Sequence, residues 1–255
     1  MNLSDRQLLT AIFGCIDNTS LNSTDSPASI AAFCQHSLSL SLPNSQNPHV
    51  ASVCVYPSLV PAAVKALQGS DISVASVAAA FPSAQAPLSS KLLEVQYALD
   101  NGAAEIDMVL SLGLFLAGEY SQVSDEISSI KNLCGSHVLK VILETSALPS
   151  PELISKASDL AIAAGADFLK TSTGKIPGGA TPEAAELMLK SIKNYYQKTK
   201  KLVGFKASGG ISSPEQALLY ASLAQSILGP QYIDKHYFRI GASRLTNSLF
   251  DFLTK

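Results

Sequence analysis

The chain has 255 residues, of which 47% are hydrophobic and 15% are charged, and its formal net charge at pH 7 is −2. This near-neutral charge gives no basic surface for nucleic acid or for an anionic membrane. The opening segment MNLSDRQLLTAIFGC lacks the basic region and apolar run of a secretory signal, and no apolar stretch approaches the roughly 20 residues of a membrane span. We therefore expect a cytoplasmic protein. The low charged fraction also favours a homo-oligomer, such as a dimer, in which more surface is buried.

Eight apolar, β-branched segments are predicted to be strands, and helix-like segments separate them. Most of the later ones recur about every 30 residues, which is the rhythm of βαβ units in a parallel sheet. Eight such units predict a single α/β domain over residues 1–255, a closed (β/α)8 TIM barrel with an extra N-terminal helix within residues 1–14. In chain order the predicted strands are Phe13–Asp17, Ala51–Val55, Asp71–Val77, Ala104–Val109, Val138–Leu143, Asp167–Lys170, Leu202–Phe205 and His236–Ile240.

Three predicted helices begin alike, with a hydroxyl residue, a proline and a glutamate in succession. The hydroxyl can cap the first turn, proline suits the first helical position, and the carboxylate favours the positive end of the helix dipole. These starts support the alternation of strands and helices. They lie at Ser150-Pro151-Glu152, Thr181-Pro182-Glu183 and Ser213-Pro214-Glu215.

The four cysteines and four histidines show no paired spacing that would hold a metal ion. We expect free, mostly buried thiols and no protein-bound metal. Cys54, at the end of the second predicted strand, is more often a packed thiol than a nucleophile in such a place.

Lysine lies at the ends of three successive predicted strands, as Lys140, Lys170 and Lys206. Lysine is seldom buried without a partner, so its repetition inside apolar strands indicates a catalytic role more than a packing role. Active sites of these barrels lie at the C-terminal ends of the strands. With Asp107 on the fourth strand, the three lysines would form one arc around that end of the barrel.

An ordinary lysine is only about 0.04% neutral at pH 7, and only the neutral amine attacks a carbonyl. A second ammonium about 6 Å away would lower the pKa by roughly 2 units, and desolvation acts in the same direction. Lys170 has a positive neighbour predicted on each side. It is therefore the candidate nucleophile of a Schiff base.

The other charged candidates, which are Asp17 and the rest of the arc, leave alternatives open. Asp107 is either the counter-ion of Lys140 or a proton carrier that works through water. Asp17 is a helix cap, the favoured interpretation, or an acceptor for a substrate hydroxyl. For Lys140 a structural ion pair is favoured over direct proton transfer. For Lys206 a functional role is favoured, because this residue directly precedes the glycine-rich segment Ala207-Ser208-Gly209-Gly210.

Glycine-rich segments follow the sixth, seventh and eighth predicted strands, as TSTGK, SGG and RIGAS. Backbone N–H groups at this edge of a barrel commonly bind phosphate, although glycine also simply makes turns. The three segments together predict a phosphate and substrate site. Its candidate residues are Thr171, Gly174, Lys175, Gly209, Gly210, Gly241 and Ser243.

These motifs resemble the deoxyribose-phosphate aldolase family, class I aldolases with a (β/α)8 barrel. IDNTSL, VCVYP, EIDMVL, LKVILET, GADFLKTSTGK, VGFKASGG and RIGAS occur in the family's order and span nearly the whole chain. The resemblance implies reversible cleavage of 2-deoxy-D-ribose 5-phosphate to D-glyceraldehyde 3-phosphate and acetaldehyde, in deoxyribonucleoside catabolism. Small molecules would be the partners, and lysine would be the electron sink, so the reaction would need no metal or other cofactor.

The resemblance also implies roles. Lys170 matches the imine-forming lysine, Lys206 the lysine that perturbs it, Asp107 the acid that relays protons, and Lys140 a lysine of the supporting network.

The chain departs from the family's pattern at two positions. Many relatives carry arginine where this chain has Ser212, and serine where it has Arg244. We hypothesise that Arg244 compensates for Ser212 at the phosphate.

Two alternative functions stay open: a related barrel with imine chemistry on another acceptor aldehyde, and a sugar-phosphate binding or regulatory protein on a decayed barrel.

Overall fold

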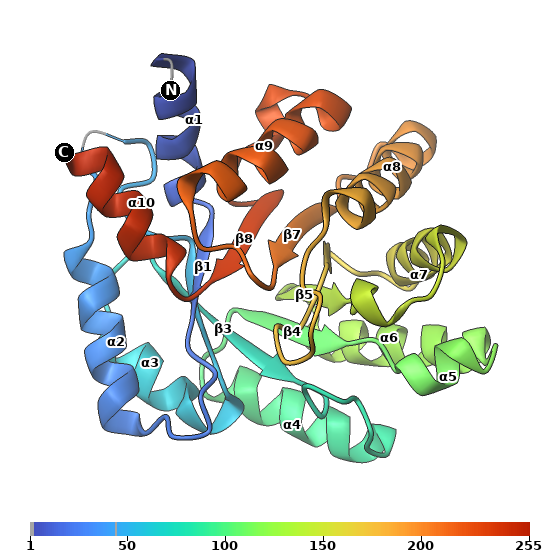
Figure 1. Ribbon diagram of the computed structural model, residues 1–255. Coiled ribbons are helices and arrows are strands. Elements are labelled where there is room, and N and C mark those ends of the chain that lie inside the picture. The colour runs from blue at the N-terminus through green and yellow to red at the C-terminus, as the bar shows by residue number, and fades with distance from the viewer. Residues whose placement is uncertain (1–2, 44) are drawn as a thin grey trace.

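The computed structural model describes residues 3–43 and 45–255. In this part of the chain, eight parallel strands close into a barrel in chain order, and β8 pairs with β1 (Figure 1). The predicted TIM barrel is confirmed. The strands are β1 Ile16–Thr19, β2 Ser52–Val55, β3 Ser73–Ala78, β4 Glu105–Val109, β5 Val138–Ile142, β6 Phe168–Lys170, β7 Gly204–Ser208 and β8 Phe238–Ala242.

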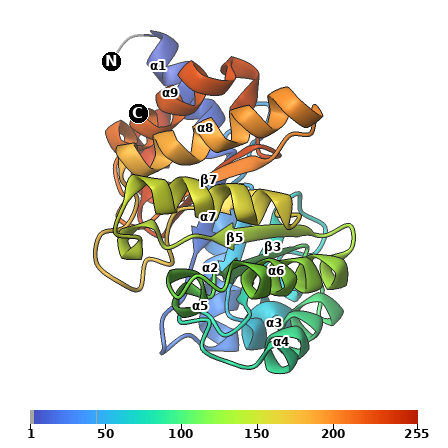
Figure 2. The same cartoon turned by 90° about the vertical axis from the view of Figure 1, so that its right-hand side faces the viewer.

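Helices surround the barrel, and Figure 2 shows α7 and α8 side by side on its wall. The extra N-terminal helix is confirmed as α1, which packs against α9 and α10. No helix of the described residues is long and apolar enough to cross a membrane. The α-helices are α1 Leu3–Phe13, α2 Pro27–Ser39, α3 Val60–Ala66, α4 Leu88–Asp100, α5 Leu112–Leu116, α6 Tyr120–Cys134, α7 Pro151–Ala163, α8 Pro182–Thr199, α9 Pro214–Leu228 and α10 Leu245–Thr254; the short 3-10 helices are η1 Pro57–Leu59, η2 Thr145–Ala147 and η3 Pro230–Tyr232.

The predicted helix starts are confirmed in atomic detail. The hydroxyls of Ser150, Thr181 and Ser213 each accept a hydrogen bond from the backbone N–H three residues later, and a proline follows each of them. The caps satisfy donors that the first helical turn would leave unpaired. The caps therefore fix the residues at which α7, α8 and α9 begin, and with them the ends of the preceding loops.

All eight strands differ from their predicted ranges by one to three residues at one end or both, and the largest differences are at β1 and β7. β1 begins at Ile16 because α1 continues through Phe13. β7 runs two residues beyond Lys206, and Leu202, which was predicted to begin it, is 45% exposed. Small residues such as Ala207 and Ser208 have little intrinsic strand preference, but pairing between two buried neighbours overrides that preference.

Gly204 makes room inside the barrel for the ring of Phe168, its register partner on β6. A Cβ atom at Gly204 would lie 2.3 to 2.5 Å from three ring carbons. We predict that Gly204→Ala lowers the free energy of unfolding by about 1–3 kcal/mol, the usual cost of overpacking a core. Urea unfolding measures this, with Gly113→Ala as control, because there the nearest atom is the flexible Gln85 amide at 3.4 Å. Equal midpoints for both variants would contradict the prediction.

Candidate active site

Among the described residues, seven charged side chains from six strands meet inside the barrel, and each is at most 5% exposed. Alternation along each strand turns them inward, and strand register brings them level: Asp107 lies opposite Lys140, and Lys170 opposite Lys206. We call this group the ion cluster. It consists of Asp17, Glu105, Asp107, Lys140, Lys170, Lys206 and Arg239.

Asp107 is the centre of the ion cluster. Its Oδ2 accepts hydrogen bonds from Lys170 Nζ at 2.7 Å and from Lys206 Nζ at 2.8 Å, and its Oδ1 accepts one from Lys140 Nζ at 2.9 Å. The structure therefore brings together the four residues of the predicted arc. Burial alone would raise the pKa of Asp107, but the three lysines hold it well below its ordinary value. The carboxylate stays ionised and bridges all three amines.

Asp17 belongs to the same cluster and caps no helix. Its Oδ2 accepts a hydrogen bond from Lys206 Nζ at 2.5 Å and lies 3.2 Å from Lys140 Nζ. Its Oδ1 accepts one from Arg239 at 2.5 Å. The next helix, α2, is capped by Ser26 instead. The favoured interpretation of Asp17 as a cap is therefore wrong, because its place on β1 turns it into the barrel.

Lys140 and Lys206 are held as ammonium ions. Burial alone would lower the pKa of Lys140, but Asp107, Asp17 and Glu105 outweigh it and raise that pKa. Burial is likewise outweighed at Lys206, whose pKa Asp107 and Asp17 raise. Lys140, which touches three carboxylates, has the ion-pair environment that the sequence favoured.

Lys170 differs from these two lysines because its pKa is lowered. Burial is the largest cause, Lys206 acts in the same direction, and Asp107 opposes both. The sequence predicts a lowering by a neighbouring ammonium together with desolvation, and allows such a neighbour on either side of Lys170. In the barrel only one side carries such a neighbour at the same level, since the register partner of Lys170 on β5 is Ile142. Desolvation of the buried amine is therefore the main reason why the pKa of Lys170 is lowered.

Sequence reasoning missed Arg239 and Glu105. Arg239 donates to Glu105 at 2.8 Å as well as to Asp17, and Glu105 also accepts from Lys140. The signal that singled out the lysines was present for both, because each is a charged residue inside an apolar strand. Glu105 also lies two residues before Asp107, which places the two carboxylates on the same face of β4.

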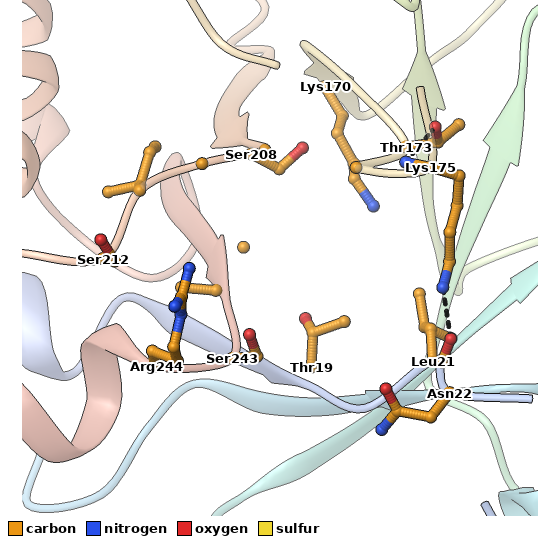
Figure 3. A pocket seen from close by; sticks show the side chains of 16 residues that line it. Thr19, Leu21, Asn22, Lys170, Thr173, Lys175, Ser208, Ser212, Ser243 and Arg244 are labelled. Carbon is orange, nitrogen blue, oxygen red and sulfur yellow. Dashed lines mark hydrogen bonds between the residues drawn. The ribbon is translucent and has the colours of Figure 1, made fainter. Parts of the chain in front are cut away.

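The amine of Lys170 points into a cavity of about 220 Å³ at the C-terminal ends of the strands (Figure 3). Loops after β1, β6, β7 and β8 supply its walls. Most of the residues predicted to bind phosphate come together here. Those that line the cavity are Gly174, Lys175, Gly209, Gly210, Gly241, Ser243 and Arg244.

Thr171 is the predicted residue that does not reach this cavity. Its hydroxyl donates to the Ser208 carbonyl and accepts from the Ser208 N–H, both at 2.9 Å. It thus ties the end of β6 to the end of β7. We assign Thr171 to holding the walls of the site together.

Lys175 runs along one edge of the cavity from the loop after β6 to the loop after β1, where its amine donates to the Leu21 carbonyl (Figure 3). The start of its loop is held by Glu144, whose carboxylate accepts from the backbone and hydroxyl of Thr173. Glu144 has a φ of +52°, an uncommon conformation for this residue. Sequence patterns gave no signal for this contact.

Arg244 and Ser212, the two departures from the family's pattern, both line the cavity. Figure 3 shows Arg244 on the same side as Ser212 and Ser243. The backbone N–H of Ser212 donates to the Gln216 side chain at 2.8 Å. A basic side chain is thus present at this wall although position 212 lacks one.

A second hollow, of about 540 Å³, lies between α4 and α6. Its buried lysine, Lys91, already donates to Glu126 at 2.7 Å and to Ser111 at 2.8 Å. Among the residues with described positions, no group of three or more histidine, cysteine or acidic side chains could hold a metal ion.

Fold and site together define a (β/α)8-barrel enzyme with a buried amine beside a glycine-rich cavity. The model of the DeoC/LacD family aldolases matches residues 25–235. This chain belongs to that family.

Relatives and a solved structure agree with this assignment. The chain is 42% identical to the deoxyribose-phosphate aldolase of Bos taurus, over 91% of this chain and 76% of the relative. It is 38% identical to that of Agrobacterium fabrum, over 97% and 92%. The deoxyribose phosphate aldolase of Aeropyrum pernix, described as a tetramer, has a TM-score of 0.76 and 25% identity, over 100% of this chain and 99% of that one.

Proposed function

We propose that this protein is a class I aldolase that reversibly cleaves 2-deoxy-D-ribose 5-phosphate to D-glyceraldehyde 3-phosphate and acetaldehyde, in deoxyribonucleoside catabolism. The observation that carries the proposal is the amine of Lys170, a buried residue, which lies 2.7 Å from Asp107 and opens onto the glycine-rich cavity. Relatives that share about 40% of the sequence bear the name of this activity.

In the cleavage direction, the neutral Lys170 amine adds to the C1 aldehyde and the adduct loses water to give an iminium ion. The C3 hydroxyl then gives up its proton, and the C2–C3 bond breaks. Its electron pair moves into the iminium to form an enamine, and glyceraldehyde 3-phosphate leaves. Protonation of C2 and hydrolysis of the iminium release acetaldehyde and restore the lysine.

Each of these steps moves a proton, and Asp107 and Lys206 are the groups placed to help. Asp107 contacts the Lys170 amine directly, and Lys206 donates to the same oxygen, Oδ2 of Asp107. Asp107 relays protons through water between the amine and the substrate, and Lys206 maintains the charge that disfavours a second ammonium.

The phosphate is held at the far side of the cavity by backbone N–H groups. Gly209 and Gly210 have φ values of +94° and +86°, so the backbone after β7 turns as side-chain-bearing residues rarely allow. A Cβ at Gly209 would lie 2.8 Å from Gly179 Cα in the loop after β6. This close approach keeps N–H groups of successive loops around one anion.

The direct test is to mix the purified protein with 2-deoxyribose 5-phosphate and to measure both aldehydes enzymatically. Equal amounts of acetaldehyde and glyceraldehyde 3-phosphate are expected. Tight binding of the sugar phosphate without release of either aldehyde would reject the aldolase and favour a binding protein.

Arg244→Ser is predicted to raise the KM for 2-deoxyribose 5-phosphate about 10-fold, with little change in kcat. A charge-assisted contact to phosphate is worth roughly 1.5–3 kcal/mol, and it acts on substrate and transition state alike. Steady-state kinetics with unphosphorylated 2-deoxyribose is the control, since its KM should not change. An unchanged KM for the phosphorylated sugar would show that Arg244 does not replace the missing basic residue at Ser212.

A second candidate function is the same imine chemistry on a different acceptor aldehyde, which the altered cavity wall at Ser212 and Arg244 favours. Rates of acetaldehyde addition to phosphorylated and unphosphorylated glyceraldehyde distinguish the two functions. A preference for the unphosphorylated acceptor would support the second candidate.

We also propose that residues 1–255 form one domain, and that it assembles as a homo-oligomer, as the tetramer of the Aeropyrum pernix enzyme suggests by analogy. A mass of one 26.7 kDa chain in light scattering would contradict assembly.

All four cysteines are free and buried, which supports a proposed cytoplasmic location. Secretion of the protein by its own cells would contradict that location.

A further inference from the structure

The ion cluster contains unequal numbers of acids and bases. Lys140, Lys170, Lys206 and Arg239 are potential cations, whereas Asp17, Glu105 and Asp107 are the anions. With every group ionised, the buried cluster would carry one excess positive charge. An uncompensated charge in the barrel interior is costly, so the favoured state is the one in which one base gives up its proton.

Arg239 cannot be the base that loses the proton, because a guanidinium stays protonated in proteins. It is also held from several sides. It contacts Asp17 Oδ1 at 2.5 Å and Glu105 Oε1 at 2.8 Å, it donates to the Lys235 carbonyl, and it lies 5.7 Å from the centre of the Phe168 ring. Arg239 is therefore a fixed positive charge inside the cluster.

The three lysines do not share the carboxylates equally. Lys140 contacts three carboxylates, Lys206 contacts two, and Lys170 contacts Asp107 alone. Lys170 is also the one of the three lysines that lines the cavity. The excess positive charge is relieved at least cost by deprotonation of Lys170.

We propose that Arg239 is a positioning residue that keeps Lys170 neutral, because it occupies Asp17 and Glu105 with a charge that cannot be removed. This inference rests on the proposed function, since it explains how the imine-forming amine is made available. It adds a residue that lies on β8, two strands away from β6, and that is separated from the substrate cavity by the cluster itself.

Other titratable groups near the cluster do not change the count. Burial raises the pKa of Cys54, on β2 beside Lys170, and it raises the pKa of Cys15, near Arg239, to about 12. Both thiols are therefore neutral near pH 7. Asp234 and Lys235, which lie just before β8, carry opposite charges that offset each other.

The test is the pH at which imine formation is half-maximal, measured by borohydride trapping of acetaldehyde on the protein and peptide mass spectrometry. Arg239→Met leaves three bases for three acids, so Lys170 can keep its proton. We expect its midpoint to rise by at least one pH unit, with a roughly 10-fold smaller trapping rate at pH 7. Arg239→Met combined with Glu105→Gln restores the excess of one cation. Its midpoint is expected to return to that of the wild type.

Glu105→Gln alone provides the opposite change. It removes an anion, and its midpoint is expected to fall below that of the wild type, which keeps the test decisive if Arg239→Met does not fold. A midpoint that is unchanged in either single variant, or that stays raised in the double variant, would overturn the inference. If the wild type itself forms no adduct at any pH, the proposed function fails instead, so the two failures are distinguishable.

Discussion

Lys170→Ala is expected to lower kcat by at least about 10⁴-fold and to abolish the borohydride-trapped adduct of acetaldehyde. The variant lacks the amine that forms the iminium ion, and without that electron sink the C2–C3 bond has no low-energy route to break. Circular dichroism should show an intact fold, because the remaining cluster still has three cations for three carboxylates. The measurements are single-turnover kinetics and mass spectrometry of the trapped peptide.

Lys175→Ala is the matched control for this experiment. It also removes an amine that lines the cavity, but that amine donates to the Leu21 carbonyl and lies outside the ion cluster. The control should still form the two-carbon adduct at Lys170. An adduct that persists in Lys170→Ala and disappears in Lys175→Ala would show that Lys175 forms the imine, which would contradict the assignment to Lys170.

Asp107→Asn is expected to separate imine formation from turnover. It removes a negative charge next to Lys170, so the amine stays neutral and still traps acetaldehyde. Proton transfer to and from the substrate loses its carboxylate, which should lower kcat by roughly 10²–10⁴-fold. Parallel measurement of adduct yield and kcat checks this. Equal losses in both would indicate that Asp107 serves only to hold the amine in place.

The same substitution is predicted to cost about 3–5 kcal/mol of stability at pH 7, since the buried ammonium groups of Lys140 and Lys206 lose a carboxylate partner that they share with the Lys170 amine. The pKa of Asp107 in the folded protein lies below its ordinary value of about 3.9, so its stabilisation is complete above that pH. It is lost as the pH falls from about 4 toward the lower folded pKa. Urea unfolding at several pH values should therefore show a smaller acid dependence in the asparagine variant, by up to about 1.4 kcal/mol per pH unit.

The barrel could be predicted because its strands are short, β-branched and evenly spaced, and because the helix starts repeat one capping pattern. Lys170 and Lys206 could be predicted for a related reason. Adjacent strands in the chain are adjacent in the barrel, so charged residues at the ends of neighbouring strands must meet.

Contacts across the interior could not be read in this way. Asp17 is on β1, yet its carboxylate reaches the amine of Lys140 on β5, at the opposite wall of the barrel. Strand order does not predict such a contact, because it depends on how far the two side chains extend into the interior. Glu105 and Arg239 likewise meet each other across the interior, from β4 and β8, although each also contacts a partner on an adjacent strand, Lys140 and Asp17 respectively. Thr171 follows directly on Lys170 but turns to the neighbouring strand, since the inward and outward faces alternate residue by residue.

All seven members of the ion cluster come from strands, whereas most residues that line the cavity lie beyond the strand ends. The rigid, hydrogen-bonded sheet thus sets the basicity of the nucleophile, and exchangeable segments select the aldehyde that meets it. Substitutions such as those at Ser212 and Arg244 can accumulate without disturbing the amine. For laboratory evolution, the loops after β7 and β8 are therefore the place to introduce diversity, and the strand interiors are the place to leave untouched.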